Sequence, residues 1–230
     1  MEHIIQQTAD GSATLFVPDM DEHYHSVKGA RTESQRIFIE MGLRASHVPK
    51  PHVLEMGFGT GLNAWLTLLA AEADRREVHY TTLERYPLSP EEADALHYAD
   101  SPLFRQLHTA PWETDVRLTP WFTLRKLKTD VLSYHPTEMF DVVYWDAFAP
   151  EKQPEMWGEP LLQTICHSMN PGGLLTTYCA KGCIRRRLQS IGFCVERLPG
   201  PPGGKREMIR ATAANRKCQK EKRKARSLIA

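Results

Sequence analysis

The sequence predicts an α/β fold: a mostly parallel sheet of seven strands with an antiparallel last strand and helices on both faces. Between residues 52 and 191, short apolar runs alternate with segments of helical periodicity, and repeated strand-helix units form parallel sheets. The next two runs, 193–198 and 207–212, are joined only by Pro199-Gly-Pro-Pro-Gly-Gly204. This loop is too short for a helical crossover, so these two strands should pair antiparallel.

The elements are expected in the following order. A small N-terminal hairpin places 14–17 and 23–26 on either side of a turn, and a helix follows over about 33–43. Strands are then predicted at 52–56, 78–84, 122–128, 142–146, 174–178, 193–198 and 207–212, and helices at 63–75, 90–98, 157–169 and 181–191. The pattern divides the chain into an N-terminal hairpin and helix extension (1–44), a main domain (45–213) and a basic tail (214–230).

Composition is that of an ordinary globular protein. The chain has 230 residues, of which 41% are hydrophobic and 25% charged, enough for one domain whose core needs no metal or disulfide. No apolar stretch reaches membrane-spanning length, and the first residues lack the features of a signal peptide. We therefore expect a cytoplasmic protein with no membrane partner. The five cysteines include no Cys-x-x-Cys pair, so we expect reduced core thiols and no bound metal.

The C-terminal end is strongly basic. From Lys205 to Arg226 the chain carries ten Lys or Arg against two Glu, whereas the whole chain has a net charge of only +1. A basic tail on a mildly acidic body favours an anionic partner such as RNA. The alternative interpretation, which the charge pattern supports equally well, is a solvated tail that binds no partner.

A glycine-rich turn, Glu55-x-Gly57-x-Gly59-x-Gly61, connects a predicted strand to the next helix. Such a turn lets the backbone approach a ligand closely and points helix N-terminal amides at it. The spacing is not that of a dinucleotide-binding turn, and the Lys-Ser or Lys-Thr of a phosphate loop is absent. A diphosphate is therefore disfavoured. The acidic residue before the glycines can hold the ammonium of an amino acid, which suits the methionine half of S-adenosylmethionine.

Two further carboxylates follow predicted strands, where ligands bind in such sheets. Glu84 can accept both ribose hydroxyls, and Asp130 can accept from the adenine amino group while Val131 packs near the ring. Either acid alone would be read as a solvated loop residue. Their joint placement after successive strands favours binding.

The strand over 142–146 brings Asp146 to the same edge, where the transferred methyl group should lie. A carboxylate there can orient an amine and take up the proton that must leave before nitrogen attacks a sulfonium methyl. The rest of the rate acceleration would come from aligning the amine nitrogen with the sulfonium methyl group for in-line displacement. The alternative is a structural strand-end cap.

The segment Asp146-Ala-Phe-Ala-Pro-Glu-Lys-Gln-Pro-Glu-Met-Trp157 closely resembles that of the MnmC/MnmD-type tRNA 5-methylaminomethyl-2-thiouridine methyltransferases. Three other segments match this family: Tyr24-His-Ser with Gly29 and Glu33-Ser, Leu54-Glu-Met-Gly-Phe-Gly-Thr-Gly-Leu-Asn63, and Gly203-Gly-Lys-Arg-Glu-Met208. The resemblance implies a Rossmann-like class I S-adenosylmethionine-dependent methyltransferase. Its main domain would methylate the aminomethyl group on carbon 5 of the tRNA wobble uridine, with or without a 2-thio group.

The resemblance also implies roles for particular residues. Those implied to hold the cofactor are Glu55, Gly57, Gly59, Gly61, Asn63, Glu84 and Asp130. Asp146 would face the amine, and Phe148, Lys152, Met156 and Trp157 would shape the base pocket. Lys205 and Arg206 would meet tRNA phosphates. The alternatives are a core position at a helix start for Trp157 and ordinary loop solvation for the two basic residues.

The sequence departs from the bifunctional members of that family. No second glycine-rich, flavin-binding unit is present, and the basic end is not part of the family pattern. We therefore expect a separate enzyme to supply a precursor that already bears a free aminomethyl group.

Two rival functions remain open at this point. Aminopropyltransferases use the same fold, a related sulfonium donor and an acid beside an amine, although their glycine turn usually differs. The second rival function is that of a non-catalytic RNA-binding module that retains the cofactor pocket without using it. Binding of S-adenosylmethionine would separate them.

Overall fold

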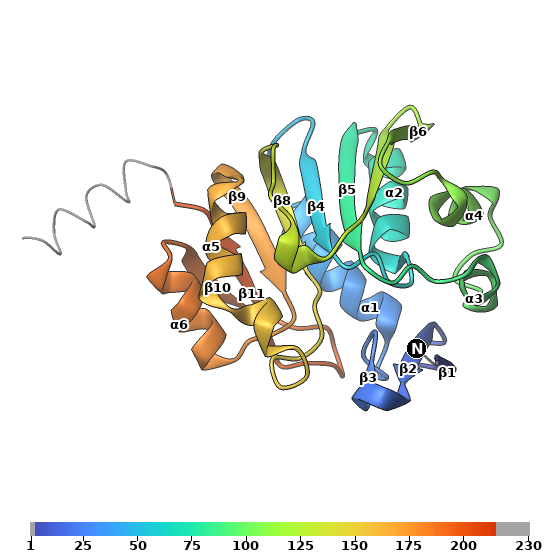
Figure 1. Cartoon of the computed structure of the whole chain (residues 1–230), viewed down its shortest axis with the longest axis horizontal. Coiled ribbons are helices and arrows are strands. Elements are labelled where there is room, and N and C mark those ends of the chain that lie inside the picture. Colours follow the sequence, from blue (N-terminus) through green and yellow to red (C-terminus); the bar gives the residue numbers. More distant parts are fainter. Residues whose placement is uncertain (1–2, 215–230) are drawn as a thin grey trace, which may run out of the picture.

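The computed structural model describes residues 3–214, and its centre is an eight-stranded sheet with the order β10-β11-β9-β8-β4-β5-β7-β6 (Figure 1). The strands are β4 (His52–Met56), β5 (Val78–Glu84), β6 (Asp115–Thr119), β7 (Phe122–Lys128), β8 (Phe140–Trp145), β9 (Met169–Thr177), β10 (Cys194–Pro199) and β11 (Glu207–Thr212). Strands β9, β8, β4, β5 and β7 are parallel, whereas β11 is antiparallel to both neighbours. The parallel strands therefore all end at one rim.

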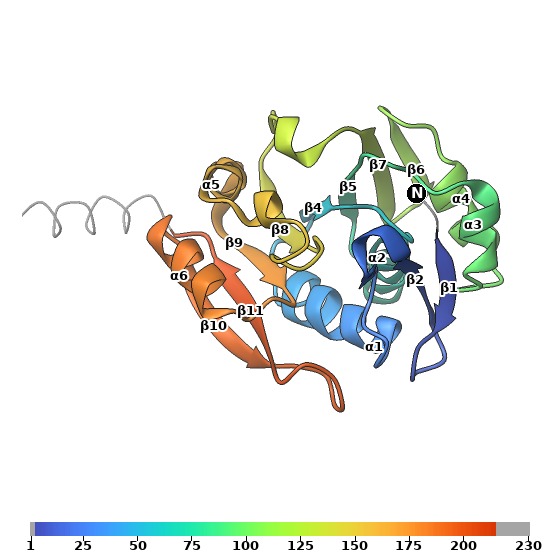
Figure 2. The ribbon, with the colours of Figure 1, turned by 60° about the horizontal axis from the view of Figure 1, so that its bottom comes forward.

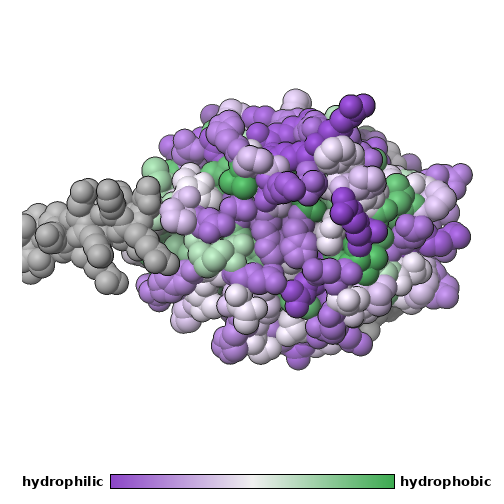
Figure 3. Space-filling model, turned by 90° about the horizontal axis from the view of Figure 1, so that it is seen from above, coloured by the Kyte–Doolittle hydropathy of each residue, from purple (hydrophilic) through white to green (hydrophobic). Residues whose placement is uncertain are grey.

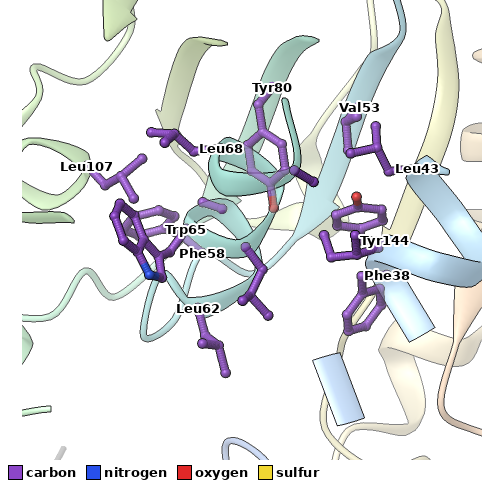
Figure 4. Close-up of a cluster of buried hydrophobic side chains, with 14 of the residues drawn as sticks. Phe38, Leu43, Val53, Phe58, Leu62, Trp65, Leu68, Tyr80, Leu107 and Tyr144 are labelled. Carbon is purple, nitrogen blue, oxygen red and sulfur yellow. The ribbon is translucent and has the colours of Figure 1, made fainter. Parts of the chain in front are cut away.

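Helices cover both faces of this sheet. One face carries α1 (Ala30–Ser34), its continuation η2 (Gln35–Leu43), α2 (Leu62–Asp74) and α4 (Pro102–Thr109), and Figure 4 shows part of their buried cluster. The other face carries α5 (Glu159–His167) and α6 (Gly182–Ser190). Because side chains alternate along a strand, Val53 joins the first cluster and Leu54 the second. The shorter elements are η1 (Pro18–Met20), α3 (Pro90–Ala95), η3 (Val131–Ser133) and η4 (Pro154–Trp157).

A second, three-stranded antiparallel sheet lies at the rim, beside α1 (Figure 2). It consists of β1 (Ile4–Gln7), β2 (Ala13–Val17) and β3 (Glu22–His23). The pairing of β2 with β3 confirms the expected hairpin. Strand β1 was not predicted, because all four of its residues are exposed and leave no apolar alternation to recognise.

The helix after this small sheet begins at Ala30 and is wound as a π-helix from Gln35 onward. It packs directly on β8 and β9 at Gly42, where a Cβ atom would lie 3.2 Å from the Tyr144 ring and 3.3 Å from Thr176 Oγ1. Residues 30–43 therefore pack as part of the main sheet's core, although the sequence pattern grouped them with an N-terminal extension.

The structure differs from the sequence expectation at several elements. The sheet has eight strands instead of seven because β6 pairs antiparallel with β7. Strand β6 was not predicted, and none of its side chains is fully buried. The helix expected over 90–98 ends at residue 95, and α4 follows it. Cys183 and Cys194 are exposed, not in the core. Among residues 3–214, no helix is long and apolar enough to cross a membrane. The basic tail lies outside the described residues.

Candidate active site

The glycine turn between β4 and α2 lies at the rim where the parallel strands end. Gly57, Gly59 and Gly61 all have positive φ angles, which side-chain-bearing residues rarely adopt. A Cβ at Gly59 would also lie 3.0 Å from the ring of Tyr24, a residue that follows β3. Backbone hydrogen bonds tie the turn to β5, because the amides of Gly57 and Phe58 both donate to the Leu83 carbonyl at 3.0 Å.

A cavity of about 190 Å³ opens beside this turn. We refer to it as the cofactor cavity, and it brings together residues from the ends of β4, β5, β7 and β8. Its walls include Gly57, Gly59, Glu84, Asp130, Val131, Asp146, Phe148 and Met156. The sequence predicted every one of these residues as part of the site.

The two carboxylates expected to hold an adenosyl group are already oriented by backbone amides. Glu84 accepts from the Gly59 amide at 2.9 Å and from the Tyr86 amide at 2.8 Å. Asp130 accepts from the Leu132 amide at 2.9 Å and from the Arg85 guanidinium at 2.6 Å. Each carboxylate oxygen can accept a further hydrogen bond, so both groups can receive hydroxyl or amino donors.

Glu55 lies beneath the turn and is fully buried. It does not line the cofactor cavity; one oxygen accepts from the Thr82 hydroxyl at 2.7 Å and the other has no hydrogen-bond partner. Burial raises the pKa of Glu55 to about 8. Glu55 was expected to hold a ligand ammonium either directly or through water. Direct contact is not available in the present arrangement, and a contact through water stays a prediction.

Asp146 accepts a hydrogen bond from a side chain in the first turn of α2. The Asn63 side-chain amide donates to Asp146 Oδ2 at 2.8 Å, and Asn63 itself is buried. Asn63 was expected to touch the cofactor, but it does not line the cavity and instead positions Asp146. Desolvation raises the pKa of Asp146 to about 7, against the opposing effect of the Asn63 hydrogen bond. The carboxyl can therefore exchange a proton near neutral pH.

A second cavity of about 440 Å³, which we call the substrate cavity, meets the cofactor cavity at Asp146 and Phe148. Tyr24 also lines both, and its ring meets the Phe148 ring edge-on with centroids 5.3 Å apart. The remaining walls include His25, Glu33, Tyr178, Lys181 and Lys205. The two cavities thus share the carboxylate that the sequence placed beside the reacting amine.

The substrate cavity contains side chains that the sequence prediction did not use as site residues. The Tyr178 hydroxyl donates to the Ala147 carbonyl at 2.8 Å, and the Lys205 ammonium lies 3.7 Å from the Tyr178 ring centroid and 2.8 Å from Glu33 Oε1. His25 contacts the Thr60 hydroxyl at 2.8 Å, and burial lowers its pKa to about 4. Tyr178 directly follows β9, so the strand-end signal used for Asp146 could have found it.

The structure separates the residues expected to form the base pocket. Phe148 lines the substrate cavity, as expected, whereas Met156 lines only the cofactor cavity. Lys205, which was expected to meet tRNA phosphates, also lines the substrate cavity. Trp157 lines neither; it is 1% exposed and donates to the Phe148 carbonyl at 2.8 Å, so it is a core residue. Lys152 lies 3.5 Å from Asp21, and Arg206 is exposed; neither lines the two cavities.

The groups around the cofactor cavity fit S-adenosylmethionine. Glu84 and Asp130 offer acceptors for ribose hydroxyls and an adenine amino group, and Val131 and Met156 offer apolar contact. The backbone at Gly59 approaches the cavity where a side chain would collide with Tyr24. A diphosphate would instead meet a wall that carries four carboxylates and one arginine.

A family model of S-adenosyl-L-methionine-dependent methyltransferases matches residues 74–214. The chain belongs to this family, and its cofactor is S-adenosylmethionine. The match begins after the glycine turn, so it does not depend on that motif.

Among solved structures, the chain is similar to MNMC2 from Aquifex aeolicus, with 27% identity and a TM-score of 0.75 over 93% of this chain and 72% of that one. Two further structures show the fold alone. A methyltransferase from Pyrococcus furiosus has 19% identity and a TM-score of 0.52 over 86% of this chain and 91% of its own. The spermidine synthase from Thermotoga maritima has 14% identity and a TM-score of 0.54 over 92% of this chain and 72% of its own.

Proposed function

We propose that this methyltransferase acts on a primary amine, the aminomethyl group on carbon 5 of the wobble uridine in tRNA. The observation that supports this most directly is the shared wall: Asp146 and Phe148 line both the cofactor cavity and the substrate cavity. The cofactor, when bound, supplies an electrophilic methyl group on a sulfonium sulfur. The similarity to MNMC2 and the matching segment 146–157 support the choice of nucleoside.

The proposed role of Asp146 is to accept a proton from the substrate ammonium, which frees the nitrogen lone pair for attack. Asn63 occupies Oδ2 of the carboxylate, and the second oxygen is left for the amine. A pKa near 7 suits this exchange, because a general base works best when its pKa lies near the operating pH. The rest of the acceleration would come from holding nitrogen, methyl carbon and sulfur in line.

The substrate cavity is suited to a nucleobase turned out of its stack. Tyr24, Phe148 and Tyr178 place three aromatic rings on its wall, and a flipped base exchanges stacking on its neighbours for contact with such side chains. Lys205 adds a cation at the same cavity, although Glu33 neutralises it here. A separate enzyme would have to supply a tRNA whose uridine already bears the free aminomethyl group.

An aminopropyltransferase activity is the rival with the same fold. The family match favours methyl transfer, and the likeness to the spermidine synthase extends to the fold only. Both reactions place an amine beside a sulfonium, so the arrangement of the site alone does not distinguish them. They differ in the sulfonium donor that reacts and in the group that is transferred. Decarboxylated S-adenosylmethionine is the donor that discriminates between them.

The test is nucleoside mass spectrometry on tRNA from cells that lack this protein. We expect 5-aminomethyl uridine, thiolated or not, to accumulate, and purified protein with S-adenosylmethionine to convert it to the methylamino form. Asp146→Asn, which keeps the size of the side chain, should abolish conversion while cofactor affinity measured by calorimetry is retained. Unchanged nucleosides in the deletion strain, or aminopropyl transfer from the decarboxylated donor, would reject the proposal.

A further inference from the structure

We propose a zinc-binding site at the opposite edge of the sheet, formed by His52, His79 and Glu138. The proposed reaction does not require it, and it departs from the prediction of no bound metal made from the cysteine pattern. His52 opens β4, His79 is the second residue of β5, and Glu138 precedes β8. The site therefore lies where these parallel strands begin, away from the rim that carries both cavities (Figure 1).

The topology brings the two histidines together. His52 and His79 are register partners on neighbouring parallel strands, so their side chains leave the same face of the sheet. Their ring centroids are 4.2 Å apart. Glu138 joins them from the loop before β8, with Oε2 3.5 Å from His52 Nε2.

The distances fit a small tetrahedral ion. One ligand atom from each of the three residues lies within 4.8 Å of the others. Ligand atoms bound tetrahedrally to zinc at about 2.0–2.1 Å are themselves separated by about 3.3 Å. The separation of His52 Nε2 from Glu138 Oε2 is already close to this value, and small side-chain rotations would bring in the third ligand.

Two features of the surroundings support a cation here. His79 Nε2 is buried and makes no hydrogen bond, although Asp115 Oδ1 lies 3.3 Å away. Asp115 could therefore supply a fourth ligand. Arg125 donates to Glu138 Oε1 at 2.9 Å, which fixes the carboxylate and leaves Oε2 facing His52. Imidazole nitrogens with one or two carboxylates form a ligand set that zinc accepts.

The competing arrangement is a network of hydrogen bonds and ion pairs without metal. His52 Nε2 already contacts the Thr81 hydroxyl at 2.9 Å, and Arg125 supplies one positive charge beside Glu138. Zinc would replace the Thr81 contact and join β4, β5 and the loop before β8 through one ion. Figure 3 views the molecule from the side on which these strands begin, and this face is largely hydrophilic. The side chains of His52, His79 and Glu138 are 17%, 29% and 37% exposed, so an ion can reach them.

The experiment uses the full chain, untagged and freed of metal with a chelator. Zn²⁺ alone should bind with a stoichiometry of one in calorimetry and raise the melting temperature. Co²⁺ alone should give the visible absorption of a tetrahedral nitrogen and oxygen site without a thiolate charge-transfer band. That band would report binding at cysteines, of which Cys183 and Cys194 are exposed.

Variants make the assignment specific. Glu138→Gln and His79→Gln should each weaken Zn²⁺ binding by more than about tenfold, and His167→Gln, at an exposed histidine on α5, should not. Melting curves without metal establish that each variant folds. Absence of binding to the native chain, a cysteine signature, or native affinity in both Glu138→Gln and His79→Gln would show that the cluster is an ion-pair network only. Methyl transfer is read separately, so neither result depends on the proposed function.

Discussion

The hydrogen bond from Asn63 to Asp146 should set the pH at which the enzyme becomes active. Asn63→Leu keeps the branching of the side chain but removes the amide that donates to Asp146 Oδ2 at 2.8 Å. A hydrogen bond to a charged group contributes about 1.5–3 kcal/mol, and one pH unit of pKa corresponds to about 1.4 kcal/mol. The pKa of Asp146, about 7 in the native protein, should therefore rise to about 8–9.

The sign of the effect follows from the role of Asp146 as a base. Only the ionised carboxylate accepts the proton, so activity rises as pH rises through the pKa of Asp146. At pH 7 the variant should be slower than the native enzyme by about 5- to 50-fold, and the two rates should converge above about pH 9. The assay is kcat against pH with saturating tRNA and cofactor; titration of the substrate amine is common to both proteins.

A control on the same helix separates this effect from damage to α2. Thr67 lies one turn further on and donates to the Asn63 carbonyl at 2.7 Å without touching Asp146, so Thr67→Val should leave the pH midpoint unchanged. An unmoved midpoint in Asn63→Leu, or a midpoint at lower pH, would refute the reasoning.

Four further outcomes are expected. Gly59→Ala should weaken cofactor binding in calorimetry, because its Cβ would meet Tyr24 at 3.0 Å; native affinity would contradict the close approach. Gly42→Ala should lower the free energy of unfolding by about 1–3 kcal/mol in urea denaturation, and an unchanged midpoint would count against the tight helix-sheet contact. The raised pKa of Glu55 means that the folded protein retains a proton that the unfolded chain releases, so stability should fall as pH rises from about 4.5 to about 8; in Glu55→Gln this fall should be smaller, and equal slopes in denaturation at several pH values would argue against it. Trp157→Phe, which loses the bond to the Phe148 carbonyl, should destabilise the protein by about 1–3 kcal/mol, and a thermal melt identical to that of the native chain would exclude a core role.

The bounds of four sheet strands were predicted correctly: the parallel strands β4, β5 and β7 and the antiparallel strand β11. In each of them the apolar residues are buried in the sheet's core, which marks the strand in the sequence. The parallel strands β8 and β9 were also found, but both begin earlier than predicted. Strand β1 was missed because all four of its residues are exposed. Strand β6 was missed although Val116 and Leu118 alternate with polar residues and pack on the core, because the strand is short and none of its side chains is fully buried. The candidate site followed the same rule: Glu84, Asp130 and Asp146 could be found because each stands at a predicted strand end.

Sequence by itself determined that several acids and a glycine turn would meet at one rim, because parallel strands must end on the same side of a sheet. Only the tertiary structure decided which of these residues line the cavities and which support them from the core. The depth of Glu55 below the turn, the contact of Asn63 with Asp146 and the burial of Trp157 depend on the packing of α2, β8 and η4, which no local pattern encodes. The pairing of His52 with His79 likewise appears only when β4 and β5 lie in register, because residues distant in sequence become neighbours only through the sheet.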